Sequence, residues 1–398
     1  MTKKLSRRTF TKAAAVTASF GLAALQTETS GAKIIGANDR VRCAFVGVAN
    51  RGRQLLDAFK KCDKMDIAGL CDVDSITLGK AKERYSTTAR TEKDFRKFLD
   101  DKDIDAMVFA TPDHWHAFQT IESCKAGKDV YCEKPLSSTV KEGRMMIQAA
   151  EKYQRVVQVG IHRRSSPLYA KLAADKLDNK LGKVTVARTG YASNMFPNGM
   201  GKAKAATPPE NLDWELWLGP KPERPFQENI APYKFRWWIA YCSQIANQGV
   251  HHIDAIRWLL GEKAPCAVCA MGGKFAVDDD RTIPDTMEVT FQFASGRIMT
   301  FSHFESNGNP FMATDENYRA LGYIELRGTQ GTLYAYDNRY IIKPERGGQF
   351  QDHKPRLEPE EYTTVGKAEG NLDLTAYHAQ NFLDCMRTRK TPRCSLEV

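Results

Sequence analysis

The chain has 398 residues, too many for one ordinary hydrophobic core and enough for two domains. Hydrophobic residues make up 42% and charged residues 27%, a composition that excludes large-scale disorder. The formal net charge is +10, but residues 1–33 carry half of that excess and the rest of the chain mixes both signs without a long basic run, so a nucleic-acid-binding surface is not supported.

The N-terminus has the pattern of an export signal. Arg7 and Arg8 precede a mildly apolar, alanine-rich stretch over residues 13–25. Basic residues before a short apolar run predict a secretory signal, and the paired arginines indicate the twin-arginine route. The stretch is shorter than the roughly 20 residues that span a bilayer. We expect residues 1–33 to be a twin-arginine signal peptide, recognised by the twin-arginine translocase and directing the protein to the periplasm. A disordered basic tail or a short membrane anchor is the alternative.

Strand and helix patterns alternate in the first half. The expected strands are 41–48, 67–71, 106–110, 129–132 and 156–159. Helical spacing follows at 52–62, 78–85, 92–99, 115–126 and 140–153. Strands that alternate with helices imply a parallel sheet covered on both faces. We therefore predict an NAD-binding Rossmann domain with a doubly wound parallel sheet over residues 39–160.

The ten cysteines are irregularly spaced. Cys43, Cys71 and Cys132 fall within these apolar strand patterns, where cysteine behaves as a small buried hydrophobe. Cys266 and Cys269 form one CxxC pair with no second pair or histidine beside it, so neither a disulfide framework nor a metal site is expected.

The second half, residues 161–398, changes character. We expect helices at 168–177 and 250–260, a long irregular segment at 193–232, and strands at 183–187, 287–293, 297–304, 323–327 and 332–336. Gly296 and Gly331 mark turns that suit antiparallel hairpins. This pattern predicts an α+β domain with an open, mainly antiparallel β-sheet that binds substrate and joins protomers of a homo-oligomer, a dimer or a tetramer.

The first expected strand runs into a glycine-containing turn that suits a dinucleotide. The turn consists of Gly47, Val48, Ala49, Asn50, Arg51 and Gly52. In GxGxxG, the first glycine permits a tight turn, the second lets the backbone approach the pyrophosphate, and the third packs helix on strand. Ala49 occupies the second position, which weakens the match. Asp72 ends the next strand, where an acid binds ribose hydroxyls and repels a 2′-phosphate, so NAD is favoured over NADP. A strand–turn–helix without a cofactor is the alternative.

Two polar motifs follow later strands. Thr111, Pro112 and His116 come after the third strand, and Glu133 and Lys134 after the fourth. Ligands bind at the carboxyl ends of parallel strands, and a lysine held there stabilises a developing alkoxide. The alternative for Lys134 is a solvated loop lysine. His114 and His116 lack further metal ligands in sequence, so no metal is predicted.

A third group opens the helix expected at 250–260. His251 and Asp254 are three residues apart and share a helix face, and Asn247 lies one turn before His251. A histidine with a pKa near about 6.5 suits proton exchange with a hydroxyl. A capping or core histidine is the alternative.

Together these motifs resemble the glucose–fructose oxidoreductase, inositol dehydrogenase and rhizopine-catabolism (Gfo/Idh/MocA) family. The resemblance covers residue 39 to the C-terminus and rests on the glycine-containing turn, Glu133-Lys134-Pro135, and Gly249 with His251 and Asp254. It implies a tightly held NAD(P) and sugar, sugar-derivative or cyclitol substrates. It also implies that Lys134 and His251 are catalytic and that a further helix follows a segment like residues 391–398. The family often has aspartate at the position of Asn247, which here orients the imidazole without supplying charge.

The expected reaction places a secondary hydroxyl between Lys134 and His251. The histidine takes the hydroxyl proton while hydride passes to the nicotinamide. The substrate pocket is expected to include His162, Arg163, Arg164, Tyr191 and Asp254, for which surface polar residues are the alternative. Tryptophans in the connecting segment either stack on sugar faces or belong to the core. These are Trp214, Trp217, Trp237 and Trp238.

We therefore predict an NAD(P)-dependent oxidoreductase of a sugar, glycoside or cyclitol, with oxidation at C3 of glycosides preferred. Because no free nicotinamide pool is expected outside the cytoplasm, the cofactor must stay bound and a second substrate must turn it over. One alternative is a glycosidase that oxidises its substrate transiently with NAD, although the intact Glu133-Lys134-Pro135 favours a dehydrogenase. The other is a non-catalytic sugar- or nucleotide-binding protein.

Overall fold

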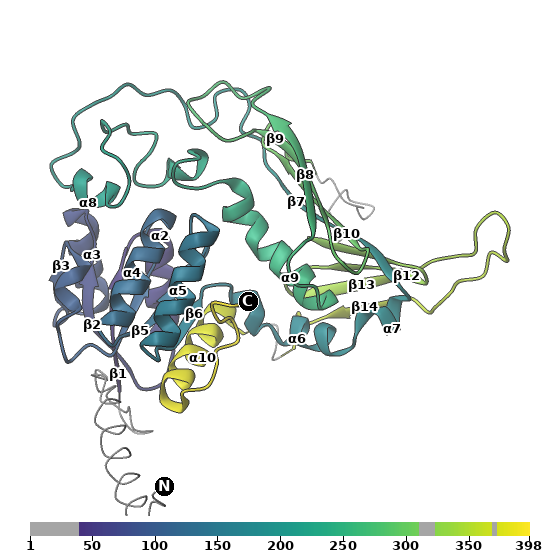
Figure 1. Ribbon diagram of the computed structural model, residues 1–398, viewed down its shortest axis with the longest axis horizontal. Helices are drawn as coiled ribbons and strands as arrows, with labels where there is room; N and C mark the ends of the chain where they lie inside the picture. The colour runs from purple at the N-terminus through teal and green to yellow at the C-terminus, as the bar shows by residue number, and fades with distance from the viewer. Residues whose placement is uncertain (1–39, 310–322, 368–371) are drawn as a thin grey trace, which may run out of the picture.

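The computed structural model describes residues 40–309, 323–367 and 372–398 and contains two β-sheets (Figure 1). The expected signal, residues 1–33, lies outside these ranges. Across the described part of the chain, no helix combines the length and apolar character that a bilayer crossing requires.

The first sheet has six parallel strands in the order β3-β2-β1-β4-β5-β6. The strands are β1 Val41–Val46, β2 Met65–Cys71, β3 Arg90–Glu92, β4 Ala106–Phe109, β5 Asp129–Cys132 and β6 Val157–Val159. The order reverses between β1 and β4, and the carboxyl ends of these two strands form the ligand-binding crevice of a Rossmann fold. The predicted doubly wound parallel sheet is confirmed.

Helices cover both faces of this sheet. They are α2 Asn50–Phe59, α3 Ser75–Tyr85, α4 Asp113–Lys125 and α5 Val140–Lys152. β4 and β5 are buried at every position, which explains why β4 is apolar throughout and β5 is apolar after Asp129. The helix expected at 92–99 is instead β3 followed by a short 3-10 turn, Phe95–Phe98, because Asp94 caps the turn and its two phenylalanines suffice to bury it.

The second sheet has eight strands in the order β14-β13-β12-β11-β7-β10-β9-β8, antiparallel except for the β7–β10 pair. The strands are β7 Val184–Ala192, β8 Ala267–Gly273, β9 Thr286–Gln292, β10 Ile298–Phe304, β11 Ile324–Gly328, β12 Gly331–Ala335, β13 Arg339–Pro344 and β14 Glu360–Thr363. The mainly antiparallel second domain is confirmed. β8, β13 and β14 lie at or next to the sheet edges, and the sequence did not indicate them.

Helices cover one face of this sheet. They are α6 Pro167–Ala174, α7 Leu177–Leu181 and α9 Val250–Leu260. The single helix expected at 168–177 is two helices, because Lys176 has a positive φ of 47° and breaks the helix there. Between β7 and α9 the chain contains only the short helix α8, Trp214–Leu218, and 3-10 and π turns.

The C-terminal helix α10, Leu374–Thr388, returns to the first domain, which a partition at residue 160 does not anticipate. Its buried Phe382 lies edge-on to Phe59 of α2 and Tyr131 of β5, with ring centroids 6.5 and 5.9 Å away. The Val159 amide donates to the Cys394 carbonyl at 2.9 Å. In Figure 1, α10 lies beside α5 and β6, away from the second sheet. The Rossmann core is thus completed by the last part of the chain.

Candidate active site

The turn after β1 has the shape that a dinucleotide phosphate needs. Gly47 has a φ of 78°, and a Cβ there would lie 2.8 Å from the Ala110 carbonyl oxygen. A Cβ on Gly52 would lie 1.7 Å from the Gly47 oxygen, so α2 packs against the turn only with glycine at this position. Ala49 is the N-cap residue of α2, directly before Asn50, and its side chain cannot cap the helix. The amide groups of the first helical turn are therefore open to an anion.

Two carboxylates lie beyond this turn. Asp72 follows β2 and accepts hydrogen bonds from the amides of Val48 at 2.9 Å and Asp74 at 3.0 Å. Burial raises the pKa of Asp72 to about 6, against the lowering effect of these amides. The Asp74 side chain caps α3 by accepting from the Thr77 amide. Both aspartates line one cavity with Gly47.

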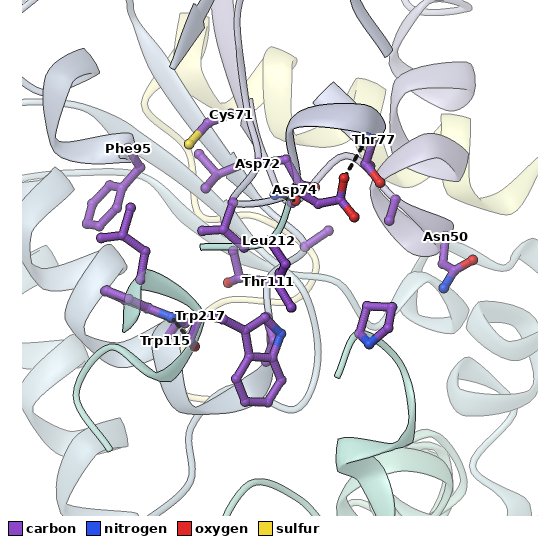
Figure 2. Close-up of a pocket in the computed structure, with 18 of the residues that line it drawn as sticks. Asn50, Cys71, Asp72, Asp74, Thr77, Phe95, Thr111, Trp115, Leu212 and Trp217 are labelled. Carbon is purple, nitrogen blue, oxygen red and sulfur yellow. Dashed lines mark hydrogen bonds between the residues drawn. The ribbon is translucent and has the colours of Figure 1, made fainter. Parts of the chain in front are cut away.

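The opposite side of this cavity comes from the segment that connects the two domains. Leu212 pairs with Asp74 in an isolated β-bridge, and the Asp213 amide donates to the Val73 carbonyl at 3.0 Å. The Trp217 carbonyl accepts from His114 Nε2 at 3.0 Å and from Trp115 Nε1 at 3.1 Å. We call residues 211–218 the strap. Figure 2 shows Asp72 and Asp74 along one side of the cavity and Trp115 and Trp217 along another, and α8 lies over the first domain in Figure 1.

An ion pair joins the turn to the second polar motif. Arg51 Nε lies 2.7 Å from Glu133 Oε1, and Glu133 Oε2 accepts from the Lys134 amide at 3.1 Å. Glu133 is 3% exposed, and a Cβ on Gly160 would fall 2.8 Å from its carboxyl group. Burial opposes the charge of Glu133, but Arg51 and Lys134 outweigh it and lower the pKa of the carboxyl. Glu133 therefore anchors Lys134 and Arg51 rather than projecting into open space.

His116 connects the two strand-end loops. Its Nδ1 lies 2.6 Å from the Pro135 oxygen and its Nε2 lies 3.0 Å from the Thr111 oxygen. Burial disfavours the charged ring, but neighbouring Cys132 and Asp113 raise the pKa of His116 to about 10. Because both ring nitrogens face carbonyl oxygens, His116 positions the loops, while Thr111 and Pro112 line the cavity.

Lys134 reaches the helix that carries the third motif. Its Nζ donates to the Asn247 backbone oxygen at 2.7 Å and to Asn247 Oδ1 at 3.1 Å. Asn247 lies in a π-helical turn, η4 Ile245–Gly249, directly before α9. Where a π-turn meets an α-helix the hydrogen-bond register changes and one carbonyl is passed over, a geometry frequent at functional sites. Burial lowers the pKa of Lys134, while Glu133 and Asp113 act in the opposite direction.

Two histidines lie next to each other in this region, and the charge of Lys134 acts on one of them, His251. The rings of His251 and His162 have centroids 5.6 Å apart. Burial, followed by the charge of Lys134, lowers the pKa of His251 well below 6.5, and burial followed by Arg51 lowers that of His162 to about 4. Both rings are therefore neutral at neutral pH and able to accept a proton.

The other predicted substrate residues have protein partners. Arg163 pairs with Asp337 and donates to the His251 carbonyl at 3.1 Å. Arg164 and Asp254 form a bidentate ion pair with contacts of 2.8 and 2.7 Å. Arg163, Arg164 and Asp254 therefore stabilise the first turns of α9.

Tyr191, on β7, lies near His303 of the second sheet, with ring centroids 6.2 Å apart. Of the four tryptophans in the connecting segment, Trp217 and Trp238 are buried, Trp217 borders the cofactor cavity, and Trp237 donates to Glu305. No motif marks Gln244 and Glu305 in the sequence, and the fold connects them to Lys134 through hydrogen bonds to Asn247.

A glycine turn that opens onto an uncapped helix, with an acid after the second strand, is the arrangement of a dinucleotide-binding Rossmann domain, and the second sheet adds a further domain. The chain belongs to the Gfo/Idh/MocA oxidoreductase family. The model of its NAD-binding Rossmann fold matches residues 41–161, and two models of its C-terminal alpha/beta domain match residues 168–319 and 244–398.

Known proteins of several activities are similar to the chain. The alpha-N-acetylgalactosaminidase of Shewanella oneidensis is 29% identical over 174 residues, which span 38% of this chain and 38% of that protein. Levoglucosan dehydrogenase in complex with NADH and levoglucosan superposes with a TM-score of 0.65 at 17% identity, covering 90% of this chain and 93% of that one. An aldose-aldose oxidoreductase from Caulobacter crescentus gives 0.62 at 20% identity, covering 90% and 92%. At identities of 17% and 20%, these two similarities show that the chain has the same fold as both proteins.

Proposed function

We propose that the protein is an exported oxidoreductase that keeps NAD bound and transfers hydride to or from a secondary hydroxyl of a sugar, glycoside or cyclitol. The observation that carries this proposal is the convergence of Lys134, Asn247, His251 and His162 at the carboxyl edge of the first sheet. A cation with neutral imidazoles beside it matches the oxidation of an alcohol, which needs alkoxide stabilisation and a proton acceptor.

The cavity fits an adenine dinucleotide. The uncapped start of α2 and the glycine cradle suit the pyrophosphate, and Asp72 and Asp74 suit ribose hydroxyls. Two carboxylates also repel a 2′-phosphate, which favours NAD over NADP. The bound nicotinamide would supply the hydride acceptor or donor.

The chain's own residues handle the proton. Lys134 holds its ammonium group against Asn247, where it stabilises negative charge on a substrate oxygen. His251, neutral because of burial and the Lys134 charge, takes the hydroxyl proton during oxidation and returns it during reduction. Glu133 and Arg51 keep Lys134 at the end of β5 during both half-reactions.

The strap supports retention of the cofactor between half-reactions. A nucleotide in the cavity would lie between Asp74 and Trp217, and its release would require the strap to separate from the first domain. A held cofactor is turned over by a second substrate, as the name of the Caulobacter aldose-aldose oxidoreductase implies for that protein. We propose oxidation at C3 of glycosides as the first half-reaction.

The test begins with protein purified without added cofactor. Denaturation and mass spectrometry should release near-stoichiometric NAD(H), and glycosides should change the absorbance of the bound reduced nicotinamide. A matched Lys134→Met variant should retain the nucleotide and lose the absorbance change. Absence of nucleotide in the wild-type protein, together with no turnover when NAD is added, would refute the proposal.

A second candidate is a glycosidase that uses NAD transiently, favoured by the similarity to the Shewanella alpha-N-acetylgalactosaminidase. Release of free sugar from a glycoside, with no net reduction of cofactor and no second substrate, identifies this activity. A product that is a keto-glycoside identifies the dehydrogenase.

Export and assembly complete the proposal. The pair Arg7-Arg8 supports the twin-arginine route, and the double variant Arg7→Lys with Arg8→Lys should leave the protein in the cytoplasm. Exposed apolar side chains on one face of the second sheet, Met271 of β8 and Ile298 of β10, support a dimer or tetramer built on this face. Light scattering of the purified protein measures that state.

A further inference from the structure

A line of hydrogen bonds leads from Lys134 into the interior of the second domain. Asn247 Oδ1 accepts from Lys134, and Asn247 Nδ2 donates to Gln244 Oε1 at 3.2 Å. Gln244 Nε2 then donates to Glu305 Oε1 at 3.0 Å. Glu305 directly follows β10 and has 0% exposure. The lysine at the reaction centre is therefore linked to a fully buried carboxylate.

The direction of these bonds is fixed at their buried end. Glu305 also accepts a hydrogen bond from Trp237 Nε1, which lies 3.0 Å from both carboxylate oxygens. The guanidinium of Arg281 forms an ion pair with the same carboxylate. Indole and guanidinium groups donate and never accept. Arg281 is itself held by Asp279 at 2.8 Å, with both side chains fully buried. The acceptor at this end of the line is therefore Glu305.

Each amide in the line has one donor end and one acceptor end, so Glu305 sets the orientation of both. Gln244 turns its NH₂ group to the carboxylate and thereby its oxygen to Asn247. Asn247 turns its NH₂ group to that oxygen and thereby its own oxygen to Lys134. Reversing Asn247 would place an NH₂ group opposite the ammonium, and reversing Gln244 would set its oxygen against the carboxylate and its NH₂ group against that of Asn247.

We propose that Glu305 and Gln244 are positioning residues for Lys134, because they keep the side-chain oxygen of Asn247 facing it as a second acceptor beside the Asn247 backbone oxygen. This inference rests on the proposed function, because it assigns a role in the reaction of Lys134. Neither residue lines the cofactor cavity, so their effect is expected on the rate of the chemical step rather than on cofactor content.

The test uses two substitutions, each of which should lower kcat alone, whereas the double variant should regain most of the wild-type kcat. Glu305→Gln places an NH₂ group where Gln244 now donates, so Gln244 reverses and Asn247 presents its NH₂ group to Lys134. We expect kcat to fall at least about tenfold with bound nucleotide and substrate KM little changed, since small displacements of a catalytic group have effects of this size or larger.

Asn247→Asp should restore activity in the Glu305→Gln background. The introduced carboxylate accepts from Lys134 on one side and from the reversed Gln244 on the other, and the oxygen of Gln244 accepts from the new amide at position 305. Alone, Asn247→Asp places an acceptor against the Gln244 oxygen and should be slow. We therefore expect both single variants to have a low kcat and the double variant to have a kcat within about threefold of wild type. Such a result is expected because residues of one hydrogen-bond network are strongly coupled.

The control is Asp285→Asn. Asp285 is also fully buried, but it accepts from the backbone amides of Phe275, Ala276 and Val277. It should lower Tm without the fall in kcat. A Glu305→Gln variant with wild-type kcat, or a double variant slower than both singles, would overturn the inference.

A readout without turnover separates this inference from the proposed function. The titration of Lys134, followed by NMR of carbon-labelled lysine and assigned with Lys134→Met, should move to lower pH in Glu305→Gln. In the double variant it should move to a pH above the wild-type value, because a carboxylate then contacts the ammonium. The other charged or titratable groups that act on Lys134 stay the same throughout: Glu133, Asp113, Arg236 and Cys242. Wild-type protein without hydride transfer would refute the proposed function, whereas an unchanged Lys134 titration would overturn the inference alone.

Discussion

Substitution of Trp217 by alanine tests whether the strap holds the cofactor. The Trp217 indole is 4% exposed and stacks on Trp214 with ring centroids 4.9 Å apart and an interplanar angle of 14°. It also lies edge-on to Tyr241 at 5.2 Å and borders the cofactor cavity. Removing a buried tryptophan costs about 3–5 kcal/mol. If that cost falls on the closed strap, its opening becomes more frequent by at least about a hundredfold, because 1.4 kcal/mol is a factor of ten.

The measured quantity is the rate at which bound NADH leaves. Protein loaded with NADH is mixed with excess NAD, and the loss of bound-NADH fluorescence is followed. Trp217→Ala should accelerate the loss by about a hundredfold and should purify with less nucleotide. Trp258→Ala is the control, since Trp258 packs in the second-domain core beneath Arg164 and should lower Tm while leaving the exchange rate unchanged. Equal exchange rates in wild type and Trp217→Ala would refute the assignment of the strap as the barrier to release.

Three further predictions follow from the site and its charges. Lys134→Met should reduce the rate of hydride transfer by about 10²–10⁴-fold in stopped-flow absorbance while the nucleotide stays bound. Arg51→Ala should lower the free energy of unfolding by about 3 kcal/mol in thermal denaturation, because the buried carboxylate of Glu133 loses its 2.7 Å partner. Arg51→Lys should recover part of that loss, and an unchanged Tm would contradict the role of the pair. Stability should fall as pH drops from about 6.5 toward 4, because burial lowers the pKa of His114, His162, His303 and His378 to about 4, so the unfolded chain binds protons that the folded chain excludes. The raised pKa of Asp72, about 6, acts in the opposite direction, and a Tm that rises on acidification would show that such carboxyl groups dominate.

The sequence was most informative where local pattern and tertiary position coincide. Buried parallel strands such as Ala106–Phe109 are apolar throughout, and Gly47 and Gly52 lie where a side chain would collide with backbone, so the Rossmann half was predictable. Lys134 and Asn247 were named from motifs, and the structure brings them within hydrogen-bonding distance across 113 residues of chain.

Features that depend on distant contacts were not predictable. β8 is exposed along most of its length and therefore lacks a strong alternating pattern. Glu305 has no motif around it, and its proximity to the lysine depends on η4 and on the position of β10 in the sheet. Arg164 and Asp254 were expected in the substrate pocket, but they bind each other. The sequence does not indicate which of two distant charged residues will form an ion pair in the fold.

The position of α10 has a consequence for biogenesis. Phe382 and its neighbours contribute to the same core as Phe59, so the nucleotide-binding half cannot bury that core while the ribosome is still adding the second domain. A Rossmann unit that lacks α10 would expose apolar surface of α2 and β5 until that helix has been synthesised. Cofactor capture and any export of a folded chain are therefore expected to wait until α10 has been synthesised and has packed against α2 and β5.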